Sequence, residues 1–198
     1  MFTGLVSSMG RLAKVEPLGA DRRCTFEVAT AFIRGVAVGD SVAVSGVCLT
    51  MVARRTRFVS ADVSAETLRA TTAGDWRVGT LVNLEKSLTL SDPLGGHLVS
   101  GHVDGIATLR ARRREGRSAD LEFGLPRGLA HYVARKGSVC LDGVSLTVNR
   151  VGKSGFGVNI VPHTLRHTTL GRLQPGDAVN LEVDLLARYL ERLTAGRP

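Results

Sequence analysis

The chain has 198 residues, 43% of them hydrophobic and 22% charged, and these ordinary proportions for a globular protein exclude wholesale disorder. Only 5% of the residues are aromatic, so a core would consist mainly of Val, Leu, Ala and Ile, and the 23 glycines indicate many tight turns. The net charge of +8 admits nucleic acid, membrane surfaces or anionic small molecules as partners and selects none of them.

Short β-prone segments recur along the chain. They cover residues 41–44, 48–52, 58–61 and 81–84, and then residues 139–141, 145–148, 156–160 and 179–183. Two pairs of these segments flank the dipeptides Ser45-Gly46 and Asp142-Gly143, which are hairpin signals. Residues 164–170 and their first-half counterpart predict short helical turns. So many short strands favour a small closed barrel in each half, because closure removes exposed strand edges.

The two halves of the chain are copies of one another. Gly46 recurs as Gly143, and the same offset of 97 residues relates segments between residues 4 and 85 to segments between residues 101 and 182. One offset kept over that length indicates a tandem duplication. We therefore predict an all-β chain with domains at residues 1–97 and 98–183 and a helical tail at 184–198.

Two segments break this symmetry. Residues 110–117 are a basic cluster that we expect in a hairpin loop, where a solvated loop is the simpler interpretation and a phosphate contact the alternative. Residues 184–195 carry apolar side chains at helical spacing, namely Leu185, Leu186, Tyr189, Leu190 and Leu193. This stripe predicts a helix that packs either on its own barrel or in a coiled contact between subunits.

Several duplicated residues have structural interpretations. Gly46 and its copy suit turns that need positive φ, Thr50 and Thr147 suit strands, and Thr67 and Thr164 suit helix caps. Nevertheless, polar uncharged residues recur at strand ends in both halves. A duplicated barrel with duplicated polar rims predicts two similar small-molecule sites.

Two histidines lie in the glycine-rich segment between the halves. His97 and His102 have no Cys, Asp or Glu at ligand spacing, so we predict no metal site. If the segment enters the second barrel as a strand, their odd separation also puts them on opposite faces. One of them beside a pocket could act as an acid, a base or a hydrogen-bond donor.

The cysteines and the N-terminus favour a cytoplasmic location. Cys24, Cys48 and Cys140 form no CxxC pair and leave one thiol unpaired, which argues against a disulfide framework. Residues 1–6 lack the basic region and apolar run of a signal peptide, and no segment approaches the roughly 18 apolar residues of a membrane span.

Six segments carry specific motifs in a fixed order. They are MFTGLV at 1–6, GVCLT at 46–50, GGHLVSGHVDG at 95–105, KG at 136–137, DGVSLT at 142–147 and PHTL at 162–165. Together they closely resemble the riboflavin synthase α-chain family over essentially the whole chain.

The resemblance implies a fold, an assembly and a reaction. The fold would be two six-stranded antiparallel Greek-key barrels in tandem plus a C-terminal α-helix, assembled through the helices as a homotrimer. The reaction would be the dismutation of two molecules of 6,7-dimethyl-8-ribityllumazine, by transfer of a four-carbon unit, into riboflavin and 5-amino-6-ribitylamino-uracil. It needs no cofactor or metal, and it takes place between the first barrel of one subunit and the second barrel of a neighbour. A lumazine synthase shell, which encloses some family members, is a candidate partner, whereas nucleic acid and membrane are not.

The resemblance also assigns two substrate pockets. The first would contain Cys48, Leu49, Thr50, Asp62, Val63, Ser64, Ala65, Glu66, Thr67, Gly101, His102 and Val103. The second would contain Gly4, Leu5, Val6, Lys136, Ser145, Leu146, Thr147, Val161, Pro162, His163, Thr164, Leu165 and Arg166. Family members often carry a lysine where this chain has Ala65, which affects a peripheral contact only.

Some residues would have roles in the chemistry itself. By resemblance, the catalytic candidates are Ser41, Cys48, His102, Asp184 and Phe2, with Phe2 at the start of the first strand and covering the site. Asp184 has a simpler interpretation as the N-cap of the terminal helix. Lys136 could favour the anion made by deprotonating the C7 methyl group of the lumazine, although a solvent-facing lysine is the simpler interpretation.

Three functions compete. The first is the enzyme, and the second is a lumazine protein, a non-catalytic relative that binds a lumazine or flavin as an optical antenna. Lumazine proteins generally lose motif residues in one half, whereas this chain keeps Thr50 with Thr147 and Thr67 with Thr164, which favours catalysis. The third, nucleic-acid binding driven by the net charge, is supported only by residues 110–117.

Overall fold

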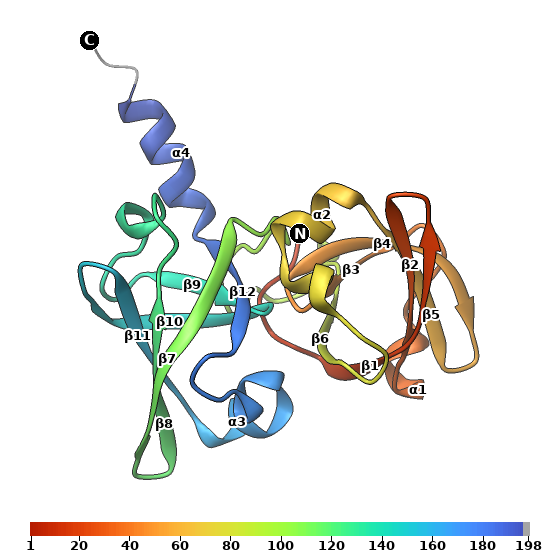
Figure 1. Ribbon diagram of the computed structural model, residues 1–198, viewed down its shortest axis with the longest axis horizontal. Coiled ribbons are helices and arrows are strands. Elements are labelled where there is room, and N and C mark those ends of the chain that lie inside the picture. Colours follow the sequence, from red (N-terminus) through yellow and green to blue (C-terminus); the bar gives the residue numbers. More distant parts are fainter. Residues whose placement is uncertain (196–198) are drawn as a thin grey trace.

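The computed structural model describes residues 1–195, which form two closed antiparallel barrels of six strands each, lying side by side (Figure 1). The strands of the first barrel are β1 (Ser8–Leu18), β2 (Asp21–Glu27), β3 (Ser41–Val44), β4 (Val47–Arg55), β5 (Phe58–Val63) and β6 (Leu81–Lys86). Those of the second are β7 (Gly105–Glu115), β8 (Ser118–Gly124), β9 (Ser138–Leu141), β10 (Val144–Val151), β11 (Gly155–Ile160) and β12 (Ala178–Val183). Both barrels have the same cyclic strand order, 1-2-5-4-3-6 within each half, so the predicted duplication of closed barrels is confirmed.

Short helices occupy equivalent places in the two barrels. The first has α1 (Thr30–Ile33), α2 (Ala65–Ala70) and the 3-10 turn η1 (Thr72–Asp75), and the second has η2 (Ala130–Tyr132), α3 (Pro162–His167) and η3 (Thr169–Arg172). The helical turns predicted around residues 67 and 164 are therefore present. The prediction that Thr67 and Thr164 cap them is wrong, because Ser64 and Val161 hold the N-cap positions. None of the helices in residues 1–195 has the length and apolar character needed to cross a bilayer.

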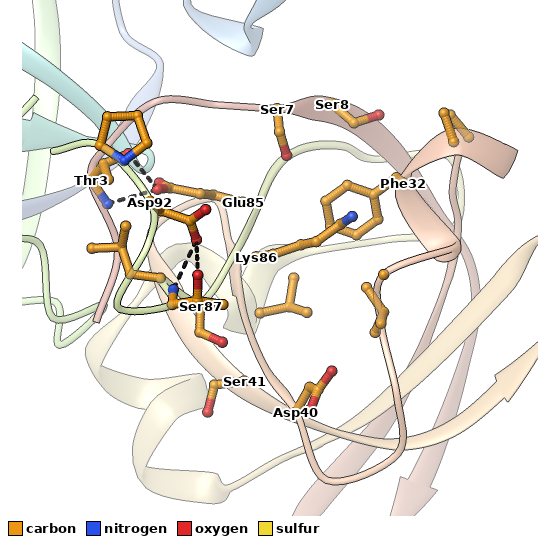
Figure 2. Close-up of a pocket in the computed structure, with 18 residues that line it drawn as sticks. Thr3, Ser7, Ser8, Phe32, Asp40, Ser41, Glu85, Lys86, Ser87 and Asp92 are labelled. Atoms are coloured by element: carbon orange, nitrogen blue, oxygen red, sulfur yellow. Dashed lines mark hydrogen bonds between the residues drawn. The ribbon is translucent and has the colours of Figure 1, made fainter. Parts of the chain in front are cut away.

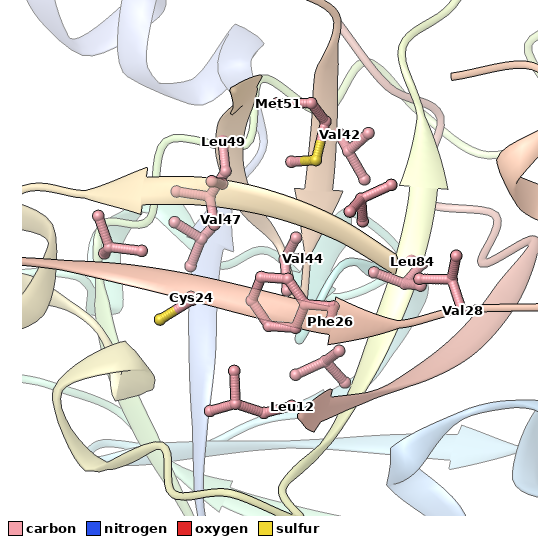
Figure 3. Packing of buried hydrophobic residues seen from close by; sticks show 14 of the residues in the cluster. Leu12, Cys24, Phe26, Val28, Val42, Val44, Val47, Leu49, Met51 and Leu84 are labelled. Atoms are coloured by element: carbon pink, nitrogen blue, oxygen red, sulfur yellow. The ribbon is translucent and has the colours of Figure 1, made fainter. Parts of the chain in front are cut away.

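Alternating apolar residues fill each barrel. Figure 3 shows Leu12, Phe26, Val44, Met51 and Leu84 converging from different strands of the first barrel. Each is fully buried, and burial of such a side chain contributes about 1.5–3 kcal/mol to stability. The outward-facing partners on the same strands are therefore free to be polar, which is how a barrel wall can carry a binding surface.

The basic cluster is part of a strand rather than a loop. Residues 110–115 continue β7, and the turn of the hairpin contains only Gly116 and Arg117, so the predicted loop is wrong. Arg112 donates to the carbonyl oxygens of Gly171 and Leu173 at 3.0 and 2.9 Å, which fastens η3 to the barrel. Arg113 faces Glu122 at 3.4 Å. These contacts give the cluster a structural role.

The seam between the barrels has approximate twofold symmetry. Gly46 and Gly143 both have a φ of +78°, as their predicted turns require, and they meet back to back. A Cβ on Gly46 would lie 2.7 Å from the backbone nitrogen of Gly143, and a Cβ on Gly143 would lie 2.8 Å from that of Gly46. Only glycine at both positions allows this approach.

Two equivalent asparagines cross the seam. Asn83 donates to the carbonyl oxygen of Asp142 at 2.8 Å, and Asn180 donates to the carbonyl oxygen of Ser45 at 2.8 Å. The amide oxygens of the same side chains accept from the backbone of Thr169 and Thr72, also at 2.8 Å. Because these polar groups are buried and satisfied only across the seam, they hold the barrels in one relative orientation.

The last helix, α4 (Leu185–Thr194), projects from the second barrel (Figure 1). Asp184 is its N-cap and accepts from the amide of Leu186 at 3.0 Å, so the capping interpretation is confirmed. An ion pair of Arg188 with Asp104 and a hydrogen bond between His131 and Glu191 fasten it to the barrel. The predicted C-terminal helix is therefore present, and residues 196–198 of the predicted tail at 184–198 lie outside the described residues.

Candidate functional site

The two predicted pockets each combine a barrel wall with a segment that crosses from the other half. The amide of Cys48 on β4 donates to the carbonyl oxygen of Gly101 at 2.9 Å, and the amide of Ser145 on β10 donates to that of Gly4 at 2.8 Å. We name the resulting assemblies the first half-site (residues 48–50, 62–67 and 101–103) and the second half-site (residues 4–6, 136, 145–147 and 161–166). The structure thus groups the crossing segments with the barrels as the sequence predicts, whereas their role in binding stays a prediction.

Glycine makes both crossings tight. A Cβ on Gly101 would lie 2.7 Å from the Cβ of Cys48, and a Cβ on Gly4 would lie 2.6 Å from the Cβ of Ser145. Both glycines also have positive φ, +78° and +74°. Any other residue would push the crossing segment off the barrel wall.

A buried glutamate holds each crossing segment. Glu85 at the end of β6 accepts from the amide and hydroxyl of Thr3 at 2.6 Å and from the amide of Gly4 at 3.0 Å. Glu182 on β12 binds Ser100 and Gly101 in the same way, at 2.6–2.9 Å. Burial raises the pKa of both carboxyl groups, and the donated hydrogen bonds oppose that rise. The sequence repeat contains both glutamates, but it did not indicate that they anchor the sites.

In the first half-site, Cys48 is half-buried and Thr50 is exposed. Asp62 is engaged by Arg23 through two hydrogen bonds of 2.7 and 2.8 Å, and these bonds lower the pKa of its carboxyl group. Ser64 caps α2, and the amide of Ala65 donates to Asp21 at 2.8 Å. Most hydrogen-bonding groups at residues 62–65 are thus already engaged within the protein. The wall of β4 and the exposed side chain of His102 remain accessible in the first half-site.

Phe2 is buried instead of covering the site. It lies outside β1 and forms a bridge with Val99, with backbone hydrogen bonds of 2.7 and 3.0 Å. Its ring is fully buried in a small cluster with Ala43, Val99 and Cys140, and Cys48 packs against that cluster. The expectation that Phe2 begins the first strand and covers the pocket is therefore wrong. Its ring can act on a ligand only through Cys48 and the crossing segment.

Ser41 lies beside the first half-site and also at a separate cavity. It is the β3 partner of Thr50 in the β3–β4 ladder. It also lines a cavity of about 650 Å³ at the mouth of the first barrel, into which Lys86 points toward the ring of Phe32 (Figure 2). The Lys86 ammonium lies 5.4 Å from the centre of that ring. The sequence had no signal for this cavity, since its lining comes from three distant segments, residues 3–8, 29–42 and 85–93.

His97 and His102, in the segment between the two barrels, lie at different half-sites. His102 follows Gly101 at the first half-site, whereas Nδ1 of His97 lies 2.6 Å from Oγ of Ser145 in the second. Neither His97 nor His102 lies in a strand, so the two side chains are not placed on opposite faces of one. Burial lowers the pKa of His97, and the negative charge of Asp184 acts in the opposite direction and raises that pKa by a smaller amount.

Lys136 has an unusual backbone. Its φ is +69°, and its amide donates to the carbonyl oxygen of Val148 at 2.7 Å. The equivalent residue in the first half is Gly39, with φ +95° and the matching bond to Met51 at 2.8 Å. A lysine in the left-handed region costs about 1–2 kcal/mol relative to glycine. Lys136 lies in an exposed turn, and the turn residues Ser45 and Asp142 also have positive φ, so the solvent-facing interpretation of Lys136 fits its position.

Comparison with known proteins identifies the repeat. The family model described as a lumazine binding domain matches residues 3–87 and again residues 100–184. Among curated proteins, the riboflavin synthase of Brucella abortus (strain 2308) is 43% identical over 98% of both chains. That of Photobacterium phosphoreum is 42% identical over 98% of this chain and 88% of its own.

Solved structures agree with the sequence comparison. The structure of LumP complexed with riboflavin superposes with a TM-score of 0.85 at 26% identity, covering 92% of this chain and 99% of that one. LumP complexed with 6,7-dimethyl-8-(1'-D-ribityl) lumazine gives a TM-score of 0.84 at 24% identity with the same coverage. Two matched lumazine-binding domains, together with full-length identity above 40% to several riboflavin synthases, show that the chain belongs to the riboflavin synthase family of enzymes.

Proposed function

We propose that the protein catalyses the dismutation of two molecules of 6,7-dimethyl-8-ribityllumazine into riboflavin and 5-amino-6-ribitylamino-uracil. The observation that carries this proposal is the duplication of the half-site, since a reaction between two identical molecules needs two similar binding surfaces. A four-carbon unit leaves one molecule and joins the other, and the two products together contain every atom of the two substrates. No external oxidant or co-reactant therefore enters the reaction.

The chain's own residues would act mainly by binding and orientation. Backbone groups and small hydroxyls at residues 48–50 and 145–147 suit a lumazine ring, whose edge alternates donors and acceptors, and a ribityl chain with several hydroxyls. Holding two reactants in attack geometry can remove several kcal/mol of the barrier. Lys136 would supply a positive charge that favours the anion formed when a proton leaves the C7 methyl group.

A complete site would combine the first half-site of one subunit with the second half-site of a neighbour. Support comes from α4, where the stripe formed by Leu186, Tyr189, Leu190 and Leu193 is 61–71% exposed. Packing on its own barrel leaves the stripe exposed, and this exposure supports helix pairing between subunits. We propose a homotrimer assembled through α4 that acts in the cytoplasm. Chromatography of the trimer mixed with lumazine synthase tests the shell separately.

The direct test is incubation of the purified protein with the ribityllumazine. Riboflavin absorbance should grow until one riboflavin has formed for every two lumazines consumed. The competing function is a lumazine-binding antenna, which the likeness to the LumP structures favours. Stoichiometric fluorescent binding without any riboflavin formation would refute the dismutation and support the antenna.

A further inference from the structure

The close contact between His97 and Ser145 is a built feature of the second half-site. The preceding residue must be glycine, because a Cβ on Gly96 would lie 2.1 Å from the carbonyl oxygen of Thr3 and 2.9 Å from the Cβ of Ser145. The His97 amide donates to the same Thr3 oxygen at 3.2 Å. With Thr3 held by Glu85, the imidazole is brought against the Ser145 hydroxyl by a continuous set of hydrogen bonds.

The burial of His97 indicates which ring nitrogen carries hydrogen. Burial lowers the pKa of His97, so the ring is neutral near pH 7 and has one N–H. In residues 1–195, Nε2 of His97 is the buried side-chain nitrogen without a hydrogen-bond partner. A buried N–H with no acceptor is rarer than an unpaired acceptor. We therefore assign the hydrogen to Nδ1, where it is donated to Oγ of Ser145.

The first half-site has no counterpart to this contact. Ser145 corresponds to Cys48 by the offset of 97 residues, so a thiol replaces the hydroxyl. The same offset takes His97 to Thr194, which lies in α4. The residue equivalent to His97 is thus not a histidine, and the half-sites differ at this position.

We propose that His97 positions the Ser145 hydroxyl as a hydrogen-bond donor toward a ring acceptor of the ligand, making the second half-site chemically unequal to the first. Because Oγ accepts from His97, the hydroxyl hydrogen is left for the ligand. Two identical substrate molecules thereby meet unlike surroundings, which a reaction with a donor and an acceptor requires. This inference rests on the proposed function, because it takes the second half-site to bind the ligand ring.

The contact is tested by riboflavin binding to the full-length protein, measured by flavin fluorescence. The wild-type protein should show two classes of binding site. His97→Leu should weaken one class about tenfold, which is the effect of losing one positioned hydrogen bond, and leave the other class unchanged. His97→Asn should restore binding, because its amide nitrogen can occupy the place of Nδ1. Ser145→Ala should match His97→Leu, and the double variant should be no weaker than either single one.

Nuclear magnetic resonance of ¹⁵N-labelled histidine supplies an independent measurement. The His97 resonance, identified by its loss in His97→Asn, should show hydrogen on Nδ1. Hydrogen on Nε2, equal weakening of both classes, or additive effects in the double variant would overturn the proposal. Wild-type binding without turnover would instead refute the dismutation, while the His97 results would still be decided by the binding data.

Discussion

Asp142 is a carboxyl group buried at the seam between the barrels, and it should make the stability of the protein depend on pH. It lies in the β9–β10 turn with a φ of +45°, and its Oδ1 accepts one hydrogen bond of 2.8 Å, from the amide of Asn180. Burial raises the pKa of Asp142 from 3.8 to about 7, and the Asn180 hydrogen bond opposes the rise. The equivalent residue in the first half is Ser45, which has no charge to bury.

The sign of the effect follows from the two protonation states. Below about pH 4 the carboxyl is protonated whether the chain is folded or unfolded, so folding carries no penalty for a buried charge. Between about pH 4 and pH 7 the unfolded chain releases the proton and the folded chain keeps it, so stability falls as the pH rises. A shift of about three pKa units corresponds to a total loss of about 4 kcal/mol.

Asp142→Asn isolates this contribution. The amide keeps an oxygen acceptor for Asn180 and tolerates positive φ, but it does not titrate in this range. Urea unfolding followed by Trp76 fluorescence at pH 4.5 and pH 8 should show the variant gaining about 3 kcal/mol relative to wild type between the two values, because about 1 kcal/mol of the loss has already occurred at pH 4.5. Because Glu85 and Glu182 are present in both proteins, their contributions cancel. An equal difference at both pH values would refute the assignment.

Three further changes test other parts of the structure. Lys136→Gly should raise the free energy of unfolding by about 1 kcal/mol by relieving its left-handed backbone and should lower turnover at least tenfold, whereas Lys153→Ala should not change turnover. Gly46→Ala should lower Tm far more than Gly19→Ala, because both have positive φ but only a Cβ on Gly46 would contact another chain segment. An equal loss in the two variants would contradict the close approach of Gly143. Leu190→Lys should leave the circular dichroism unchanged while sedimentation shows monomers and turnover disappears; a trimer that survives would disprove assembly through α4.

The sequence by itself determined the duplication, the barrel class and the terminal helix. Each of these follows from local or periodic features of the sequence, such as the hairpin turns at Gly46 and Gly143 and the apolar stripe of α4. The loop predicted at residues 110–117 is wrong because arginines on the outward face of a strand cannot be told from loop residues when the partner strand is unknown. Thr67 was misjudged because Ser64, three residues earlier, supplied the cap.

Only the tertiary structure decided how the half-sites are assembled. The hydrogen bonds that Thr3 donates to Glu85 and that Ser100 donates to Glu182 join residues 82 positions apart, and no local sequence pattern marks such pairs. The sequence assigned His97 to neither pocket, yet the chain path brings its ring against Ser145. The backbone strain at Lys136 is likewise invisible in a residue name. These features depend on which surfaces meet after the barrels close, because packing across the seam, and not residue type, determines each contact.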